Sequence, residues 1–180
     1  MPYLVGAVVI VGVLALLNLL LTFGVIRRLR EHSERLSRPA AGLPDLMLGV
    51  GESPGHFTAR TTEGEQVSLQ TLAGGEQLVG FFSPTCQPCK EVAPQFVARA
   101  AAVGRAGALA VVVGGPEEVE DLVTTFEPVA RVVVEAVVSG AVASAFRVNG
   151  FPALCLLDAD GVVTASGHEA VQEVGASAAA

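Results

Sequence analysis

The sequence predicts an α/β domain in which helices flank a mixed central sheet, with an N-terminal β-hairpin extension and a single N-terminal transmembrane helix before it. Three observations predict this architecture. An uncharged apolar run of 23 residues covers positions 4–26. Between residues 78 and 146, short apolar runs alternate with longer stretches of helix formers, as in strands joined by helices. Two short strand-like runs joined by a turn then predict a C-terminal hairpin.

The apolar run at residues 4–26 is predicted to span a membrane as an uncleaved anchor. Its length exceeds the roughly 20 residues that a helix needs to cross a bilayer. A secretory signal peptide would begin with basic residues and end at a small-residue cleavage site. Here the residues before the run are uncharged, and bulky Phe23 and a cluster of arginines mark its end. We therefore assign residues 1–38 to a transmembrane anchor and a basic juxtamembrane stalk.

The charge of the stalk bears on the orientation of the anchor and on possible partners. Residues 27–38 carry five arginines and two glutamates, although the whole chain has a formal net charge of −7. By the positive-inside rule, the arginines favour a cytoplasmic location for everything that follows them. The remainder of the chain is strongly acidic and repels polyanions, so nucleic acid is excluded as an expected partner.

A linker and a globular domain are predicted after the stalk. Residues 39–55 contain three prolines and four glycines, which is typical of a tether. The domain is expected to cover residues 56–180. It opens with two short alternating runs at residues 57–62 and 66–69, and Gly64 lies in the turn between them, so a β-hairpin is predicted.

The remaining elements are predicted from short apolar runs and from helix-forming stretches. Pro94 is expected to kink the first long helix rather than to end it. Pro116 is expected to open the second, because proline suits the first turn of a helix. The predicted strands cover residues 78–82, 108–113, 131–138, 152–157 and 162–166, and the predicted helices cover residues 86–102, 116–126 and 141–146, with at most a short helix in the tail at 169–180.

The Cys86-Gln87-Pro88-Cys89 motif carries the predicted chemistry. Three cysteines are too few for a scaffold held by disulfides, whereas a Cys-x-x-Cys pair beside a strand-helix pattern indicates redox chemistry. Cys86 is expected at a helix start, where free N–H groups stabilise its thiolate, so it is predicted to be the nucleophile. Cys89 lies one turn further on and is predicted to resolve the mixed disulfide. Pro88 stiffens the turn between them.

Two segments resemble the thioredoxin superfamily. The sequence FFSPTCQPCKEVAP is similar to the strand, active-site turn and proline-kinked helix of that superfamily. Gly150, Phe151 and Pro152 precede a hydrophobic strand and match its cis-proline loop. The resemblance implies a thioredoxin-like fold in which this loop faces the cysteines and docks an extended client segment through backbone hydrogen bonds. Pro152, Phe151 and Pro88 are then the expected substrate-binding residues.

The spacing of the two motifs resembles one branch of that superfamily. Pro152 lies 66 positions after Cys86, as in TlpA-like membrane-anchored proteins, which include the MauD-type maturation proteins. Residues 116–138 would be the extra helix and strand of that branch. This resemblance implies a bacterial, single-pass thiol-disulfide oxidoreductase of the protein-disulfide reductase type, with no cofactor beyond its redox-active cysteine pair. It also implies client proteins with cysteines or disulfides, a membrane redox partner, and a redox domain outside the cytoplasm, in contrast to the arginines.

The sequence departs from the superfamily pattern near the cysteines. Thr85 stands where a tryptophan is usual, and Gly80 stands where an acidic or amide residue is common. A buried proton acceptor for Cys89 is therefore missing from its usual place. Val92 occupies a position that is often acidic in the TlpA-like branch, and Glu91 comes one position earlier.

Three other functions are possible for these residues. A zinc site would need four ligands, and no second Cys-x-x-Cys pair accompanies the first, so no metal site is predicted. Cys155, in the apolar run ALCLL, is expected to be a buried hydrophobic residue. A peroxiredoxin-like thiol peroxidase would carry a Pro-x-x-x-Thr/Ser-x-x-Cys pattern, which Ser83 fits and Val79 does not. A non-catalytic docking module with the same fold would not need the cysteines.

Overall fold

The computed structural model describes residues 46–172, together with Gly12. The chain separates into two units, Met1–Leu43 and Pro44–Ala180, and the second contains residues 46–172. The described part of the chain contains no helix that combines the length and the hydrophobicity needed to span a bilayer. The predicted span at residues 4–26 lies, apart from Gly12, outside the described residues.

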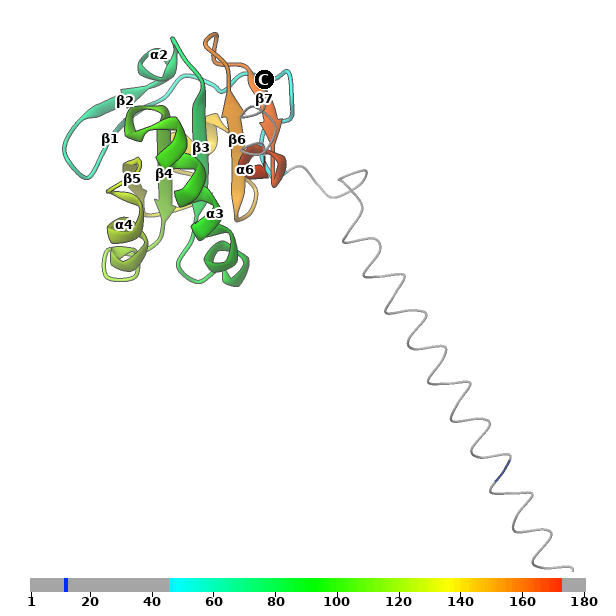
Figure 1. The fold of residues 1–180 in the computed structure, drawn as a ribbon. Coiled ribbons are helices and arrows are strands. Elements are labelled where there is room, and N and C mark those ends of the chain that lie inside the picture. The colour runs from blue at the N-terminus through cyan, green and yellow to red at the C-terminus, as the bar shows by residue number, and fades with distance from the viewer. Residues whose placement is uncertain (1–11, 13–45, 173–180) are drawn as a thin grey trace, which may run out of the picture. The chain divides into compact units, whose positions relative to one another are not determined.

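A mixed five-stranded sheet forms the centre of the domain (Figure 1). Its strand order is β5-β4-β3-β6-β7. β3 pairs in parallel with β4, and β4 with β5, whereas β6 is antiparallel to both β3 and β7. The predicted mixed α/β architecture is therefore confirmed. The strands are β3 (Gln77–Phe82), β4 (Ala108–Val113), β5 (Arg131–Glu135), β6 (Ala153–Leu157) and β7 (Val163–Ser166).

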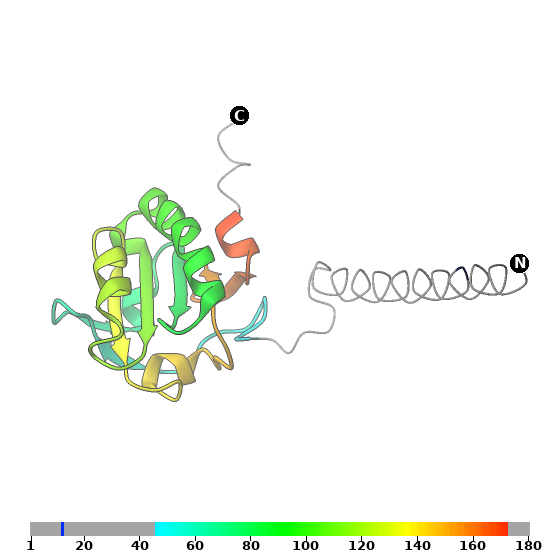
Figure 2. The ribbon, with the colours of Figure 1, turned by 90° about the horizontal axis from the view of Figure 1, so that it is seen from below.

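Helices and loops cover both faces of the sheet (Figure 2). On one face lie α3 (Gln87–Val103), α4 (Glu120–Phe126) and α6 (Glu169–Gln172). On the other lie α5 (Ala141–Ala145), the hairpin of β1 (Thr58–Arg60) and β2 (Gln66–Ser68), and the first described residues. The short α2 (Leu69–Leu72) and the 3-10 helix η1 (Arg105–Gly107) are two elements that the sequence did not predict.

Side-chain alternation along the strands divides the interior into two hydrophobic cores. Val79 and Phe81 of β3 point into the core beneath α5 and the hairpin. Leu78 and Phe82 point into the core beneath α3 and α4. This alternation follows from the two-residue period of a strand. Burial on both faces explains why β4 and β6 are apolar throughout and why β3 is apolar after Gln77.

The predicted strands and helices of the domain are confirmed, and two of their boundaries differ from the prediction by more than two residues. α4 begins at Glu120 rather than at residue 116, because the N–H groups of Glu118 and Val119 both bond to the Gly115 carbonyl and close a turn first. β5 ends at Glu135 rather than at residue 138. The chain turns there because the buried Glu135 carboxylate accepts hydrogen bonds from α5.

The N-terminal hairpin lies against one edge of the sheet. β1 (Thr58–Arg60) and β2 (Gln66–Ser68) pair antiparallel, as predicted. Beyond β1, Thr61 forms an antiparallel bridge with Val133, and the Thr62 N–H donates to the Val132 carbonyl at 2.8 Å. The hairpin is thereby joined to the edge strand β5.

Residues 46–52 lie along the opposite edge, beside β7. The Gly51 N–H donates to the Val163 carbonyl at 2.8 Å, and the Val163 N–H donates to the Glu52 carbonyl at 2.9 Å. Met47 and Leu48 are buried in the core beneath α5. These residues fall in the stretch that the sequence assigns to a linker, so the packed domain begins at least ten residues before the predicted start at residue 56.

Candidate functional site

The cysteine motif lies where the central strand β3 passes into α3. After Phe82 the chain makes a turn in which the Cys86 N–H donates to the Ser83 carbonyl at 3.2 Å. Cys86 is the N-cap of α3, with an extended backbone conformation, and Pro88 follows in the first helical turn. Proline is accommodated here because the first N–H groups of a helix have no partner within it. The helix continues through Pro94 to Val103, as predicted.

Cys86 and Cys89 are joined by a disulfide, and their Cα atoms are 5.3 Å apart. The Cys89 N–H donates to the Cys86 sulfur at 3.2 Å. Cys86 is half-buried, whereas Cys89 is fully buried. The sulfur of Cys86 is therefore the more accessible of the two, and it sits where a helix N-terminus stabilises a thiolate.

The surroundings of Cys89 are apolar. Its side chain belongs to the core that contains Phe82, Phe96 and Phe126, whose ring centroids lie 4.7 to 5.3 Å from one another. A Cβ atom added to Gly80 would lie 2.7 Å from the rings of both Phe82 and Phe96. Aromatic rings thus fill the space beside Gly80, and a carboxylate at this position has no room.

The register of β3 and β6 brings the Pro152 loop to the same end of the sheet as the cysteines. Phe81 pairs with Ala153, so Pro152 lies opposite Phe82, four residues before Cys86. The peptide bond between Phe151 and Pro152 is cis, as the resemblance implied. Phe151 is half-buried and packs against both hydrophobic cores. Pro88 is exposed on the first turn of α3.

Exposed charged side chains surround this end of the sheet. Lys90 and Glu91 are exposed on α3, and Val92 is buried beneath it. Gly114 packs close to Pro84, because a Cβ atom on Gly114 would lie 3.1 Å from the Pro84 ring. The turn before Cys86 therefore lies against the loop that carries the exposed Glu117 and Glu118.

Among residues 46–172, no group of three or more His, Cys, Asp and Glu side chains is arranged to hold a metal ion.

Cys155 lies apart from the disulfide. It is a fully buried thiol in the middle of β6, in the core on the opposite face of the sheet from Cys89. Burial raises the pKa of the Cys155 thiol far above its ordinary value, because a thiolate there would lose its hydration. The thiol stays protonated and behaves as a small apolar side chain, as predicted.

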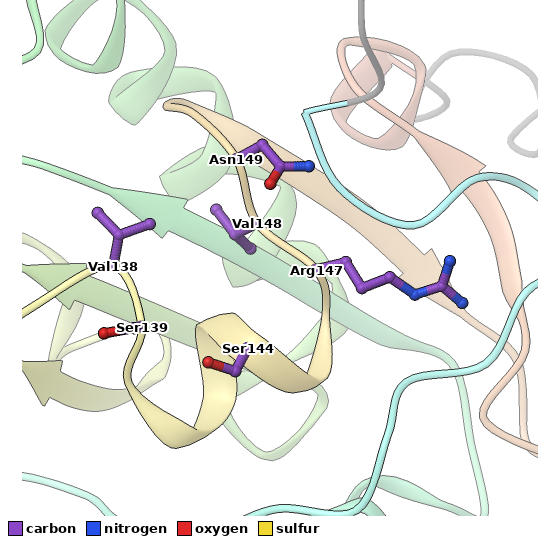
Figure 3. A pocket seen from close by; sticks show the side chains of 6 residues that line it. All are labelled: Val138, Ser139, Ser144, Arg147, Val148 and Asn149. Atoms are coloured by element: carbon purple, nitrogen blue, oxygen red, sulfur yellow. The ribbon is translucent and has the colours of Figure 1, made fainter.

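A shallow pocket adjoins the segment that leads to Pro152 (Figure 3). It is lined by Val138, Ser139, Ser144, Arg147, Val148 and Asn149. In Figure 3, the Arg147 side chain extends away from the pocket toward the N-terminal segment, where its guanidinium pairs with Glu52 at 3.0 Å. The pocket lies on the α5 side and contains neither cysteine.

Sequence reasoning missed two residues that support this region. Glu135 accepts hydrogen bonds from the Val142 and Ala143 N–H groups at 2.7 and 3.1 Å, which fixes the start of α5. Leu46 packs on Gly150, immediately before the cis peptide bond. The signal for Leu46 was the apolar run of residues 46–48 inside an otherwise proline- and glycine-rich stretch.

Solved structures with the same fold include proteins of thiol-disulfide chemistry. The thioredoxin domain of a thiol-disulfide oxidoreductase from Bacteroides vulgatus has a TM-score of 0.55 and 21% identity, over 66% of this chain and 88% of that one. A thiol:disulfide interchange protein from Bacteroides sp. has a TM-score of 0.54 and 21% identity, over 66% and 81%. A secreted Mycobacterium tuberculosis disulfide oxidoreductase, homologous to E. coli DsbE, has a TM-score of 0.51 and 23% identity, over 60% and 80%.

These likenesses establish the thioredoxin-like fold of the domain. Among curated proteins, none matches the sequence. The model of the AhpC/TSA family matches residues 50–166, a region that includes the β1–β2 hairpin, both cysteines and the cis-proline loop. Since this match covers well over half of the 180 residues, the chain belongs to the AhpC/TSA family.

Proposed function

We propose that this protein is a thiol-disulfide oxidoreductase of the protein-disulfide reductase type that acts on client proteins through Cys86 and Cys89. One observation carries the proposal. A disulfide at the N-terminus of α3 joins a half-buried cysteine to a fully buried one, and the strand register brings a cis-proline loop to the same end of the sheet. Pro152, with Phe151 and Pro88, would form the surface on which an extended client segment docks.

The proposed reaction passes through a mixed disulfide. In the reduced protein, the Cys86 thiolate attacks one sulfur of a client disulfide, the client S–S bond breaks, and the second client sulfur leaves as a thiolate that takes up a proton. The Cys89 thiol then loses its proton and attacks the Cys86 sulfur. The client leaves as a dithiol, and the Cys86–Cys89 disulfide re-forms. A dithiol redox partner must return two electrons to the pair before the next cycle.

Trapping of the mixed disulfide tests this mechanism. In a Cys155→Ala background, Cys89→Ser should accumulate mixed disulfides with a reducible model client, because no resolving thiol remains. Cys86→Ser should accumulate none, because the attacking thiol is gone. Non-reducing electrophoresis and mass spectrometry would identify the bond. Equal trapping by both variants, or none by either, would overturn the proposal.

Two further assays distinguish the alternative functions. A thiol peroxidase would consume hydrogen peroxide with a reducing thiol in a Cys86-dependent manner, whereas we expect negligible peroxide turnover because Val79 stands where the peroxidatic pattern requires proline. A non-catalytic docking module would keep its partner after Cys86→Ser. We expect that substitution to abolish exchange instead.

The same proposal places the domain outside the cytoplasm of a bacterium, anchored by residues 4–26 and reduced by a membrane redox partner. The length of the uncharged run supports an anchor. The arginines at residues 27–38 favour the opposite orientation. Labelling of reduced cysteines on intact cells with an impermeant maleimide would decide between the two, since only an outward-facing Cys86 would react.

A further inference from the structure

We propose that Leu46 is a positioning and specificity-determining residue of the docking loop, and that it favours client segments with an aliphatic side chain next to the reacting cysteine. This inference rests on the proposed thiol-disulfide exchange. The docking loop is here Gly150, Phe151 and Pro152.

Backbone hydrogen bonds tie the N-terminal segment to the residues just before the docking loop. The Asn149 N–H donates to the Leu46 carbonyl at 2.8 Å, and the Leu48 N–H donates to the Phe146 carbonyl at 3.1 Å. The Leu48 side chain is buried in the same core as Phe146. Leu46 is therefore held in place by its own carbonyl group and by the anchored Leu48 two residues later, and not only by its side chain.

An ion pair reinforces the attachment further along the same segment. The Arg147 guanidinium lies 3.0 Å from the Glu52 carboxylate, and the Gly49 N–H donates to that carboxylate at 2.8 Å. These contacts hold the pKa of Glu52 below its ordinary value, with the Gly49 hydrogen bond as the larger cause. Residues 46–52 thus lie alongside residues 146–149, the segment that leads into the docking loop.

The Leu46 side chain lies where a side chain on Gly150 would be. A Cβ atom added to Gly150 would be 2.8 Å from Leu46 Cδ2. Leu46 nevertheless remains 43% exposed, so it presents an apolar surface beside the loop. Phe151 and Pro152, the next two residues of the loop, are also apolar and only half-buried. An aliphatic side chain of a docked segment would cover Leu46, whereas a charged one would lose hydration there.

Paired peptide substrates test the specificity. Two disulfide-linked peptides would be compared, identical except for Leu or Asp beside the cysteine, with hydroxyethyl disulfide as a small probe that has no side chain for Leu46 to contact. For Leu46→Asp we expect the KM of the Leu peptide to rise about three- to tenfold. This factor corresponds to the loss of the apolar burial that a docked peptide would give the exposed part of Leu46. In the same variant we expect kcat, the rate of hydroxyethyl disulfide reduction and the reduction potential of the Cys86–Cys89 pair to stay unchanged. In the separate variant Leu46→Met, the KM of the Leu peptide should equal that of the wild type.

Val50 supplies the matched control. It is a 64% exposed residue of the same segment and lies at the other end of β7, so Val50→Asp should leave both peptides unaffected. Gly150→Ala provides a second variant, because its Cβ displaces only the flexible end of Leu46. Its effect on KM should not add to that of Leu46→Ala.

Three results would overturn this inference alone, and the first two are an unchanged KM in Leu46→Asp and an equal rise in KM for the Leu and Asp peptides. An equal loss of the hydroxyethyl disulfide rate would also overturn it, since the substitution would then act on the cysteines. If the wild-type protein reduced neither the peptides nor the small probe, the proposed function would fall first and this inference with it.

Discussion

Gly80→Ala should destabilise the domain, although alanine is otherwise better suited than glycine to the interior of a strand. The new Cβ would lie 2.7 Å from the rings of Phe82 and Phe96, both of which are fully buried. Overpacking of a core costs about 1–3 kcal/mol, and the smaller conformational entropy of the unfolded alanine chain returns about 0.4–1 kcal/mol. The difference spans about 0–3 kcal/mol, and we expect a net loss near its middle, about 1–2 kcal/mol, in the free energy of unfolding.

Urea unfolding of the oxidised protein measures this loss. With an m-value of about 2 kcal/mol/M, the midpoint should fall by roughly 0.5–1 M. Gly75→Ala is the control, because a Cβ there meets nothing within 4 Å. Adding Phe96→Leu should recover part of the loss by making room. A midpoint for Gly80→Ala equal to or above that of the wild type would refute the packing argument, and with it the reason that no acid occupies this position.

Buried groups give three other predictions. Reduction of the Cys86–Cys89 disulfide, which closes a four-residue loop, should lower the free energy of unfolding by about 2 kcal/mol, and equal urea midpoints for the two forms would contradict this. Glu135→Ala should cost about 2–4 kcal/mol in thermal unfolding because two amides of α5 lose their acceptor, and Glu135→Gln should cost less; equal losses would exclude the hydrogen-bond explanation. Burial raises the pKa of the Cys155 thiol, so Cys155 should resist alkylation by iodoacetamide at pH 8 until urea unfolds the protein. Rapid labelling of the native protein would contradict this, because it would show that the thiol is accessible.

The elements that carry the cysteines could be predicted because their signals are local. The apolar run before Ser83 predicts a strand buried on both faces, and the spacing of Cys86 and Cys89 predicts a pair in one helical turn. The position of Pro152 opposite the end of β3 depends on how β3 and β6 pair. From the sequence, this position could be predicted only through the resemblance to the thioredoxin superfamily. Patterns along the chain do not state which strands become neighbours.

The predictions that failed depend on distant contacts. β5 ends at Glu135 because that carboxylate binds the start of α5, and no local signal shows such a partner. Residues 46–48 have the composition of a linker around them, and their burial depends on Phe146, about a hundred positions later. The absence of an acid at Gly80 could be read from the sequence, but its packing reason could not, because Phe96 reaches this space only when α3 folds back over β3.

Both edge strands of the sheet are covered by hydrogen-bonded segments of the same chain, which limits how other chains can pair with the sheet. An open strand edge is a template for fibrils and for strand addition by passing peptides. Here Thr61 and Thr62 occupy the outer side of β5, and Gly51 and Glu52 occupy the outer side of β7. These contacts occupy hydrogen-bonding groups at both edges of the sheet, so strand addition there is disfavoured, and the client segments that the proposed function requires are left to bind at the loops.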